Sequence, residues 1–200
     1  MNFWYPNHTA RASTYIALCA FLRLRKGTAG ETRIPLDDDE GASLISSAFE
    51  DIRIGATSTT QWRTITESYV QDFAELTWDR HPVHLDSDYA EHTRFGRRIA
   101  HGALMLSTLL GLVELNPRYL QCFYGLDQVR FHAPTYFGDA VQAVTKVVAV
   151  RPRSDGETAV VTCSGALVNK SGTTIVSGMF EFLVAGHAQA MDMNKVSHSN

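Results

Sequence analysis

The feature that most constrains this fold is the segment of residues 99–113, which is apolar on nearly every side when it is drawn as a helix. A helix that is apolar all round is buried by the structure around it. The segment is shorter than the roughly 20 residues needed to cross a bilayer. It therefore predicts a helix in the core of a globular domain, which the rest of the chain has to cover.

The chain after this helix is rich in Val, Phe, Tyr and Thr, which are typical of strands. Short turns with Pro, Gly or Asp separate four such stretches. The expected strands are residues 123–133, 140–151, 158–169 and 174–185. Because adjacent strands joined by short turns pair antiparallel, we expect an α+β domain in which an antiparallel sheet curls around the buried helix. A second copy would cover the exposed edge of this sheet, so we expect a homodimer.

A strand and a helix are expected ahead of the buried segment. Residues 61–66 alternate as in a short strand. Thr64 and Glu67 form the S/T-x-x-E pattern of a capping box, which marks the start of a helix. One apolar face of that helix follows at Val70, Phe73 and Ala74.

Pro82 sets where this helix can end, because proline disfavours helix in the residue ahead of it. We therefore expect residues 79–86 to form a loop, followed by a helical turn at residues 88–92. Loops on a rigid scaffold are common positions for catalytic side chains.

The chain of 200 residues is expected to form one domain with two flanking segments. Residues 1–47 are a partly flexible extension in this interpretation, and an acidic run at residues 37–40 marks its boundary. The acid-poor, Arg-containing start also fits an organelle transit peptide, and that alternative stays open. Residues 48–188 form the expected domain, and residues 189–200 a loose tail.

Charge and cysteine spacing exclude several classes of protein. A net charge of −3 without a basic stripe argues against nucleic-acid binding. Cys19, Cys122 and Cys163 lie far apart, so neither a zinc ribbon nor a disulfide framework is expected. We expect a cytoplasmic protein with no nucleic-acid or membrane partner.

Asp79 and His84 lie five residues apart in the expected loop, with Pro82 between them. A carboxylate and an imidazole held together can share general acid and base catalysis, because one takes a proton from water while the other donates one. In the structural alternative, Asp79 caps a helix and His84 packs in the core. The spacing alone leaves both interpretations open.

His101 and Gly102 lie where the buried helix begins. The first amides of a helix have no partner within it, and the helix dipole adds positive charge there. A glycine lets a ligand approach the backbone, so this position can hold a thioester oxygen as negative charge develops on it. The alternative is a glycine that is needed only for tight packing.

Two further groups of residues have weaker patterns. A basic cluster of Arg94, Arg97 and Arg98 could contact the phosphates of coenzyme A or phosphopantetheine, and a solvated loop is the alternative. His81 and His84 form an H-x-x-H pattern beside two aspartates, which is poor spacing for a metal site, so we expect no metal. No G-x-S-x-G, P-loop or G-x-G-x-x-G motif occurs.

The most specific motif spans two neighbouring segments, FAELTWDRHPVHLDSDYA at residues 73–90 and TRFGRRIAHG at residues 93–102. FEDIRIG at residues 49–55 and FHAPTYFGD at residues 131–139 accompany it. Over residues 49–185 the chain resembles the MaoC-like dehydratase family, which includes the (R)-specific enoyl-CoA hydratases.

The resemblance implies a hot-dog fold, usually dimeric. It implies that Asp79 and His84 are the catalytic pair and that the amide of Gly102 holds the thioester carbonyl, and we expect His101 and His81 beside the substrate. The implied reaction adds water to a trans-2-enoyl thioester of coenzyme A or an acyl carrier protein, or reverses this with an (R)-3-hydroxyacyl thioester. It needs no metal or redox cofactor.

Three positions depart from the family pattern. Trp78 replaces a common Gly, His81 a common Asn, and Arg98 a common Pro. These changes bear on the substrate more than on the chemistry. Two alternative functions stay open, a hot-dog thioesterase that hydrolyses the thioester and a non-catalytic subunit that binds acyl thioesters.

Overall fold

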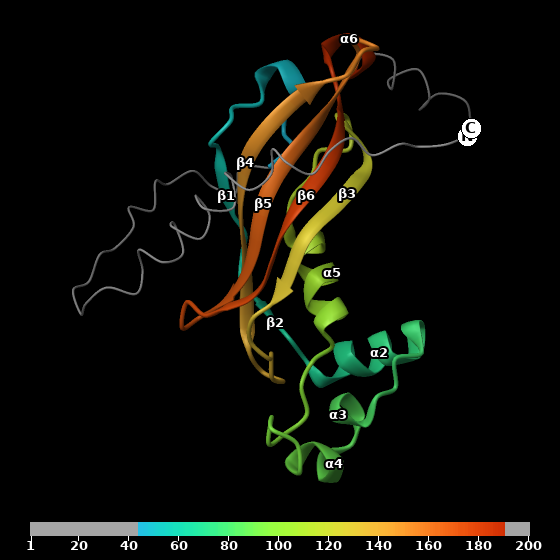
Figure 1. The fold of residues 1–200 in the computed structure, drawn as a ribbon, viewed down its shortest axis with the longest axis vertical. Coiled ribbons are helices and arrows are strands. Elements are labelled where there is room, and N and C mark those ends of the chain that lie inside the picture. The colour runs from blue at the N-terminus through green and yellow to red at the C-terminus, as the bar shows by residue number, and fades with distance from the viewer. Residues whose placement is uncertain (1–43, 191–200) are drawn as a thin grey trace, which may run out of the picture. The chain divides into compact units, whose positions relative to one another are not determined.

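The computed structural model describes residues 44–190, and the structural statements below concern these residues. A six-stranded antiparallel sheet forms most of the domain (Figure 1). Its strands are β1 (Thr57–Thr59), β2 (Arg63–Thr64), β3 (Leu120–Phe131), β4 (Ala140–Pro152), β5 (Thr158–Asn169) and β6 (Thr174–Ala185). The order across the sheet is β1-β4-β5-β6-β3, and β2 also pairs with β4.

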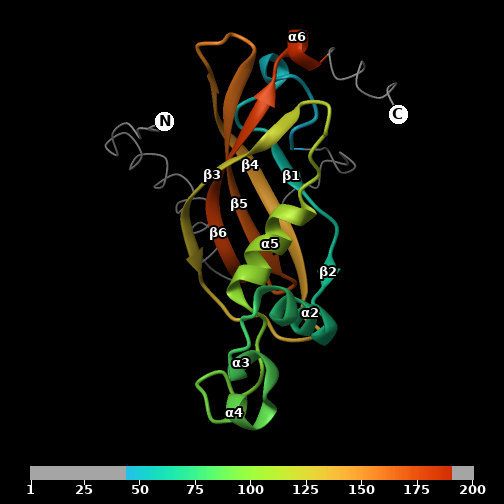
Figure 2. The same ribbon diagram turned by 90° about the vertical axis from the view of Figure 1, so that its right-hand side faces the viewer.

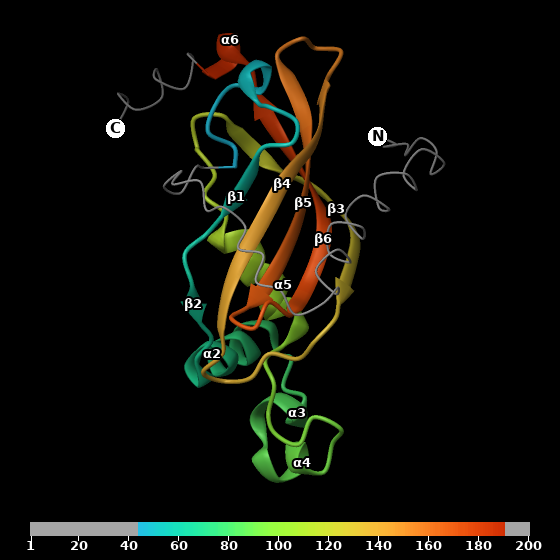
Figure 3. The ribbon, with the colours of Figure 1, turned by 90° about the vertical axis from the view of Figure 1, so that its left-hand side faces the viewer.

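One helix packs on the sheet and the others lie around its ends. The helices are η2 (Phe49–Asp51), α2 (Glu67–Thr77), α3 (Pro82–Leu85), α4 (Ser87–Glu91), α5 (Gly102–Leu112) and α6 (His187–Ala190). The α5 helix lies against β4, β5 and β6 (Figure 2), whereas α3 and α4 project beyond one end of the sheet (Figure 3). A sheet wrapped around a central helix is the α+β hot-dog architecture that the sequence predicts, so this prediction is confirmed.

The core lies between α5 and the concave face of the sheet. Met105 and Leu109 are the fully buried residues of α5, and they pack in one cluster with apolar side chains of β4, β5 and β6. Burial alternates along β4 and β6, as expected for strands with one face against a core. β5, the central strand of the sheet, is buried along most of its length.

The four long strands are predicted closely, but one pairing is not. β4, β5 and β6 begin at the expected residues, and β3 begins three residues before the expected start at Phe123. β3 pairs with β6, not with β4, which follows it in the chain. The reason is that β1 and β2 occupy the outer edge of β4, which leaves β3 the free edge of β6.

The segment before α2 needs two corrections. The strand expected over residues 61–66 is wrong in extent, because β2 covers only two of these residues and β1 lies before them. The helix start is also misplaced by two residues. Thr66, not Thr64, is the cap of α2, and its hydroxyl accepts the Tyr69 N–H at 3.3 Å.

The expected loop and buried helix also differ from the structure at their ends. Residues 79–86 are not wholly a loop, because Pro82 starts the short helix α3 within them. The buried helix begins at Gly102, three residues after its expected start at residue 99. The amides of Ile99 and Ala100 donate instead to the carbonyls of Val83 and Thr135, at 3.2 and 2.8 Å, which holds them outside the helix. Burial reaches one face of α5 in the single chain, not every face.

The domain boundaries at residues 47/48 and 188/189 stay predictions. Most of the expected extension and nearly all of the expected tail lie outside the described residues. Within the described part, Leu44 and Ile45 are already buried in the core, and Ile45 forms a parallel bridge with Leu115. Core packing therefore includes a few residues ahead of the predicted boundary.

Candidate active site

The carboxylate of the expected pair follows the end of α2. The helix ends at Thr77, and Trp78 takes the left-handed conformation with φ 64° and ψ 13°. This conformation suits the last turn of a helix but favours glycine, and a bulky side chain there costs about 1 kcal/mol. The turn redirects the chain, so that Asp79 leaves the helix axis and lies exposed beside the start of α5.

The imidazole of the pair is carried by α3. Pro82 occupies the first turn of this helix, where its missing N–H costs nothing. His81 is the cap, and its Nδ1 accepts the Val83 N–H at 3.2 Å. Val83 is buried and anchors the helix, which leaves His84 half-buried on its other side.

A backbone carbonyl fixes the tautomer of His84. Its Nδ1 lies 2.8 Å from the carbonyl oxygen of Ile99, so Nδ1 is the protonated nitrogen and donates. Nε2 then carries the lone pair. Burial lowers the pKa of His84, the hydrogen bond to Ile99 opposes that shift, and the neighbouring His101 adds to it. The ring is therefore held neutral and able to accept a proton over more of the acidic range than a free imidazole.

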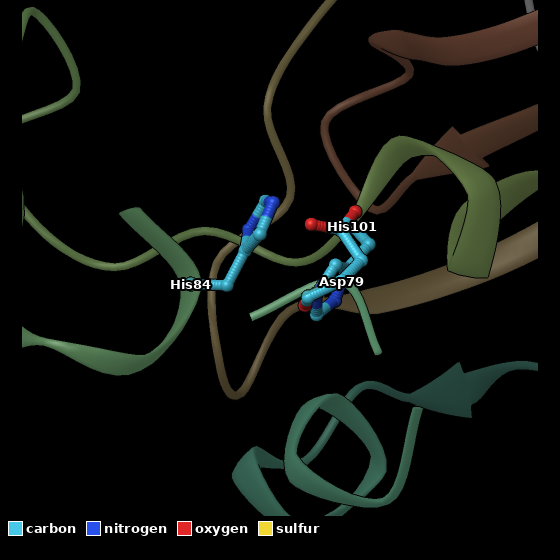
Figure 4. Close-up of side chains that lie close together, drawn as sticks. All are labelled: Asp79, His84 and His101. Carbon is cyan, nitrogen blue, oxygen red and sulfur yellow. The ribbon is translucent and has the colours of Figure 1, made fainter. Parts of the chain in front are cut away.

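His101 brings the two expected catalytic residues together. Its side chain is 1% exposed and lies between them, with Nε2 2.8 Å from the main-chain oxygen of Asp79. Its ring stacks on that of His84 with centroids 3.8 Å apart and an angle of 32° between the planes. Figure 4 shows the three side chains gathered from three separate segments.

A metal ion fits this cluster poorly. Asp79, His84 and His101 each offer one ligand-type atom, and these atoms lie within 4.8 Å of one another. The lone pairs of an imidazole lie in the plane of its ring, however, so two stacked rings direct them side by side, not toward one ion. The geometry favours proton transfer, and the expected absence of a metal stays a prediction.

Of the H-x-x-H pattern and the aspartates beside it, His81 and Asp86 serve as helix caps. His81 uses Nδ1 to cap α3, and Asp86 caps α4 by accepting the Tyr89 N–H at 3.0 Å. The ring of His81 lies edge-on to His84 and to Tyr89, with centroids 6.2 and 5.8 Å apart. His81 therefore adjoins the cluster while it shapes the helix that carries His84, a role that the spacing did not indicate.

Gly102 is the first residue of α5, so its amide has no partner within the helix. No acceptor for this amide is found within residues 44–190. A Cβ at this position would lie 3.1 Å from the ring of Phe131. The glycine therefore serves close packing and also leaves a free donor, so both interpretations of this position have structural support.

The three arginines separate into different roles. Arg98 pairs with Glu67 at 2.7 Å and ties α2 to the segment before α5. Arg97 lies 3.8 Å over the ring of Tyr136, and no acidic partner is found for it in the described part of the chain. A surface pocket of about 230 Å³ lies beside both arginines. Arg94 is exposed over the ring of Phe95.

Comparison with known proteins identifies the family. The family described as "MaoC like domain" matches residues 51–169, more than half of the chain. The chain belongs to the MaoC-like dehydratase family.

Relatives of this MaoC-like chain include a hydratase and a dehydratase. It is 35% identical over 138 residues to the (R)-specific enoyl-CoA hydratase of Rhodospirillum rubrum, covering 68% of this chain and 90% of that protein. It is 36% identical over 119 residues to the 3-hydroxybutyryl-CoA dehydratase of Methylorubrum extorquens, covering 58% and 73%. The R-hydratase PhaJ1 of Pseudomonas aeruginosa superposes with a TM-score of 0.58 at 28% identity, over 72% of this chain and 86% of that one.

The helices of the MaoC-like domain are all short. Between residues 44 and 190, none is long and apolar enough to span a membrane.

Proposed function

We propose that this chain adds water to trans-2-enoyl thioesters and removes it from (R)-3-hydroxyacyl thioesters, with Asp79 and His84 as general acid and base. The observation that carries the proposal is an exposed carboxylate beside a half-buried imidazole. The Nε2 of this imidazole is open, because Nδ1 carries the proton and donates to the Ile99 carbonyl. The hydratase and dehydratase names of the relatives support the same chemistry.

The proposed hydration places one water molecule between the two side chains. His84 Nε2 accepts a proton from this water, and the carboxylate of Asp79 holds its other hydrogen. The water oxygen bonds to the β-carbon, and the electrons of the double bond move to the thioester oxygen. The pair then returns one proton to the α-carbon, so the product contains both parts of the water and the side chains regain their starting state.

The thioester oxygen carries negative charge in the middle of this reaction. The open amide of Gly102, at the positive end of the dipole of α5, is the proposed donor to that oxygen. An amide fixed in place is effective because it needs no reorganisation as charge develops. His101 precedes Gly102 at the start of α5, and His81 lies beside His84 at the cap of α3, so both are proposed to border the substrate.

The acyl carrier is proposed to meet the surface at Arg97. The guanidinium of Arg97 lies over the ring of Tyr136 and borders the pocket of about 230 Å³, in which it could pair with a phosphate. Arg98 is a weaker candidate because Glu67 already pairs with it. Coenzyme A and an acyl carrier protein both carry a suitable phosphate.

We also propose a homodimer. β3 is an edge strand of the sheet, and it exposes Phe123, Tyr124, Leu126 and Phe131. A second copy would cover these side chains and the unpaired edge. A cytoplasmic location is proposed from the cysteine pattern, to which the free Cys122 and Cys163 conform.

The test follows loss of the enoyl absorbance of crotonyl-CoA and of a medium-chain trans-2-enoyl-CoA. Asp79→Asn should lower turnover by about 10²–10⁴-fold. Asp72→Asn, on the exposed side of α2, is the matched control and should keep wild-type turnover. Release of free thiol in place of enoyl loss would favour the thioesterase, and binding without turnover would favour the non-catalytic subunit.

A further inference from the structure

We propose that His101 is a positioning residue that sets the distance and orientation between Asp79 and His84. This inference rests on the hydration chemistry proposed above. Nothing in the reaction as written requires the ring of His101, yet this ring touches both members of the pair and is almost wholly buried.

The first contact holds the carboxylate segment. Asp79 is exposed and follows a left-handed turn, so its own surroundings restrain it little. The Nε2–H of His101 donates to its main-chain oxygen at 2.8 Å. The other polar contact to its backbone is a weak one, from its amide to the Thr77 hydroxyl at 3.4 Å. The buried ring is therefore the firm link between this exposed segment and the core.

The second contact holds the imidazole. The face of the His101 ring lies on His84 at a centroid distance of 3.8 Å, while the carbonyl of Ile99 holds His84 Nδ1 at 2.8 Å. Both restraints come from the same short segment before α5, and this segment also ends in the Gly102 amide. Asp79, His84 and the Gly102 amide are thus all held in place by the segment at the start of α5, and His101 makes two of these contacts.

The unused nitrogen of His101 argues against a purely structural role. The residue occupies the cap position of α5, but its side chain makes no capping hydrogen bond. Nδ1 is buried and has no partner within residues 44–190. Ser, Thr, Asn or Asp would cap this helix better, and a buried polar atom without a partner lowers stability. His101 is therefore a poor cap for α5, but its ring is well placed to hold Asp79 and His84.

Within residues 44–190, the titratable groups that act on the pKa of His84 come from three segments. Asp79 faces it from the end of α2, His81 from the cap of α3, and His101 from the start of α5. Phe73 of α2 contacts the ring of His101, with centroids 5.1 Å apart. Of these groups, His101 acts on His84 most strongly, and it lowers the pKa of His84. Its removal should therefore raise that pKa, since burial would remain.

Two variants separate the two contacts. His101→Phe keeps a ring against His84 and loses the hydrogen bond to Asp79, whereas His101→Gln keeps a donor and loses the ring. We expect His101→Phe to lower kcat by roughly 10- to 100-fold, as for other residues that orient a reacting group, with KM changed less than about threefold. His101→Gln should recover part of that loss. His92→Gln, at an exposed position after α4, is the control and should leave kcat unchanged.

Two further readouts distinguish positioning from structure. The melting temperature of His101→Phe should stay close to that of wild type, because removal of the partnerless nitrogen offsets loss of the hydrogen bond to Asp79. The acidic limb of kcat/KM should move to higher pH, together with the titration midpoint of His84 measured by NMR. If His101→Phe does not fold, the same measurements on His101→Gln decide.

Wild-type kcat and an unmoved His84 titration in the folded variants would overturn the inference. Failure of the proposed function looks different, because wild type would then lack turnover or Asp79→Asn would retain it. In that case the NMR titration still tests His101. A raised His84 midpoint in the variants would support the positioning contact, and an unmoved one would refute it.

Discussion

Replacing His81 with alanine should slow turnover without unfolding the domain. His81 Nδ1 accepts the Val83 N–H at 3.2 Å and caps α3, the four-residue helix that carries His84. Loss of a helix cap costs about 0.5–2 kcal/mol. A single turn cannot sustain itself, so this cost falls on the conformation that places His84 beside Asp79. The expected result is a roughly 2- to 30-fold lower kcat.

Asparagine is the matched replacement at this position, because it caps helices well. His81→Asn should keep kcat within about twofold of wild type in the same assay of trans-2-enoyl-CoA hydration, with melting curves to confirm folding. A wild-type kcat in His81→Ala would refute the capping argument. If His81→Asn were as slow as His81→Ala, the ring contacts with His84 and Tyr89 would matter instead of the cap.

Four further outcomes follow from the site. Because burial lowers the pKa of His84, kcat/KM should fall as the pH is lowered, with a midpoint below about 6.5. A pH profile of kcat/KM with a midpoint at or above that value would contradict this prediction. Gly102→Ala should lower kcat, since the added Cβ lies 3.1 Å from Phe131, and Gly102→Ala combined with Phe131→Leu should recover part of the loss if crowding is the cause. Arg97→Ala should raise KM several-fold for a coenzyme A thioester but not for an N-acetylcysteamine thioester, which has no phosphate. Arg98→Ala should instead lower the melting temperature, because it removes the ion-pair partner of Glu67. Equal KM effects on both substrates would exclude Arg97 from carrier binding.

The sheet was predictable from the sequence because each long strand has a local signature. Val-rich and Thr-rich stretches between Pro or Gly turns locate β4, β5 and β6 from the chain itself. The pairing of β3 with β6 was not predictable, since it depends on which edges β1 and β2 occupy. These two strands are too short to leave a clear period in the sequence.

The candidate site was predictable in its residues but not in its contacts. The loop pattern and the family resemblance single out Asp79, His84 and Gly102, and the structure gathers the first two with His101. The stacking of His101 on His84 and the carbonyl partner of each ring depend on backbone that lies 15 to 22 residues away in the chain. Such contacts leave no spacing for a sequence pattern to reveal. Neither does the capping role of His81, which requires knowing that α3 forms.

The most direct test of the central claim is a double-mutant cycle of Asp79→Asn and His84→Ala, with kcat for trans-2-enoyl-CoA hydration as the measurement. If the two side chains act on one water as a unit, each single change should lower kcat by about 10²–10⁴-fold, and the double variant should be hardly slower than the slower single variant. Losses that multiply in the double variant would show that the two residues act independently. Wild-type turnover in either single variant would contradict the account outright.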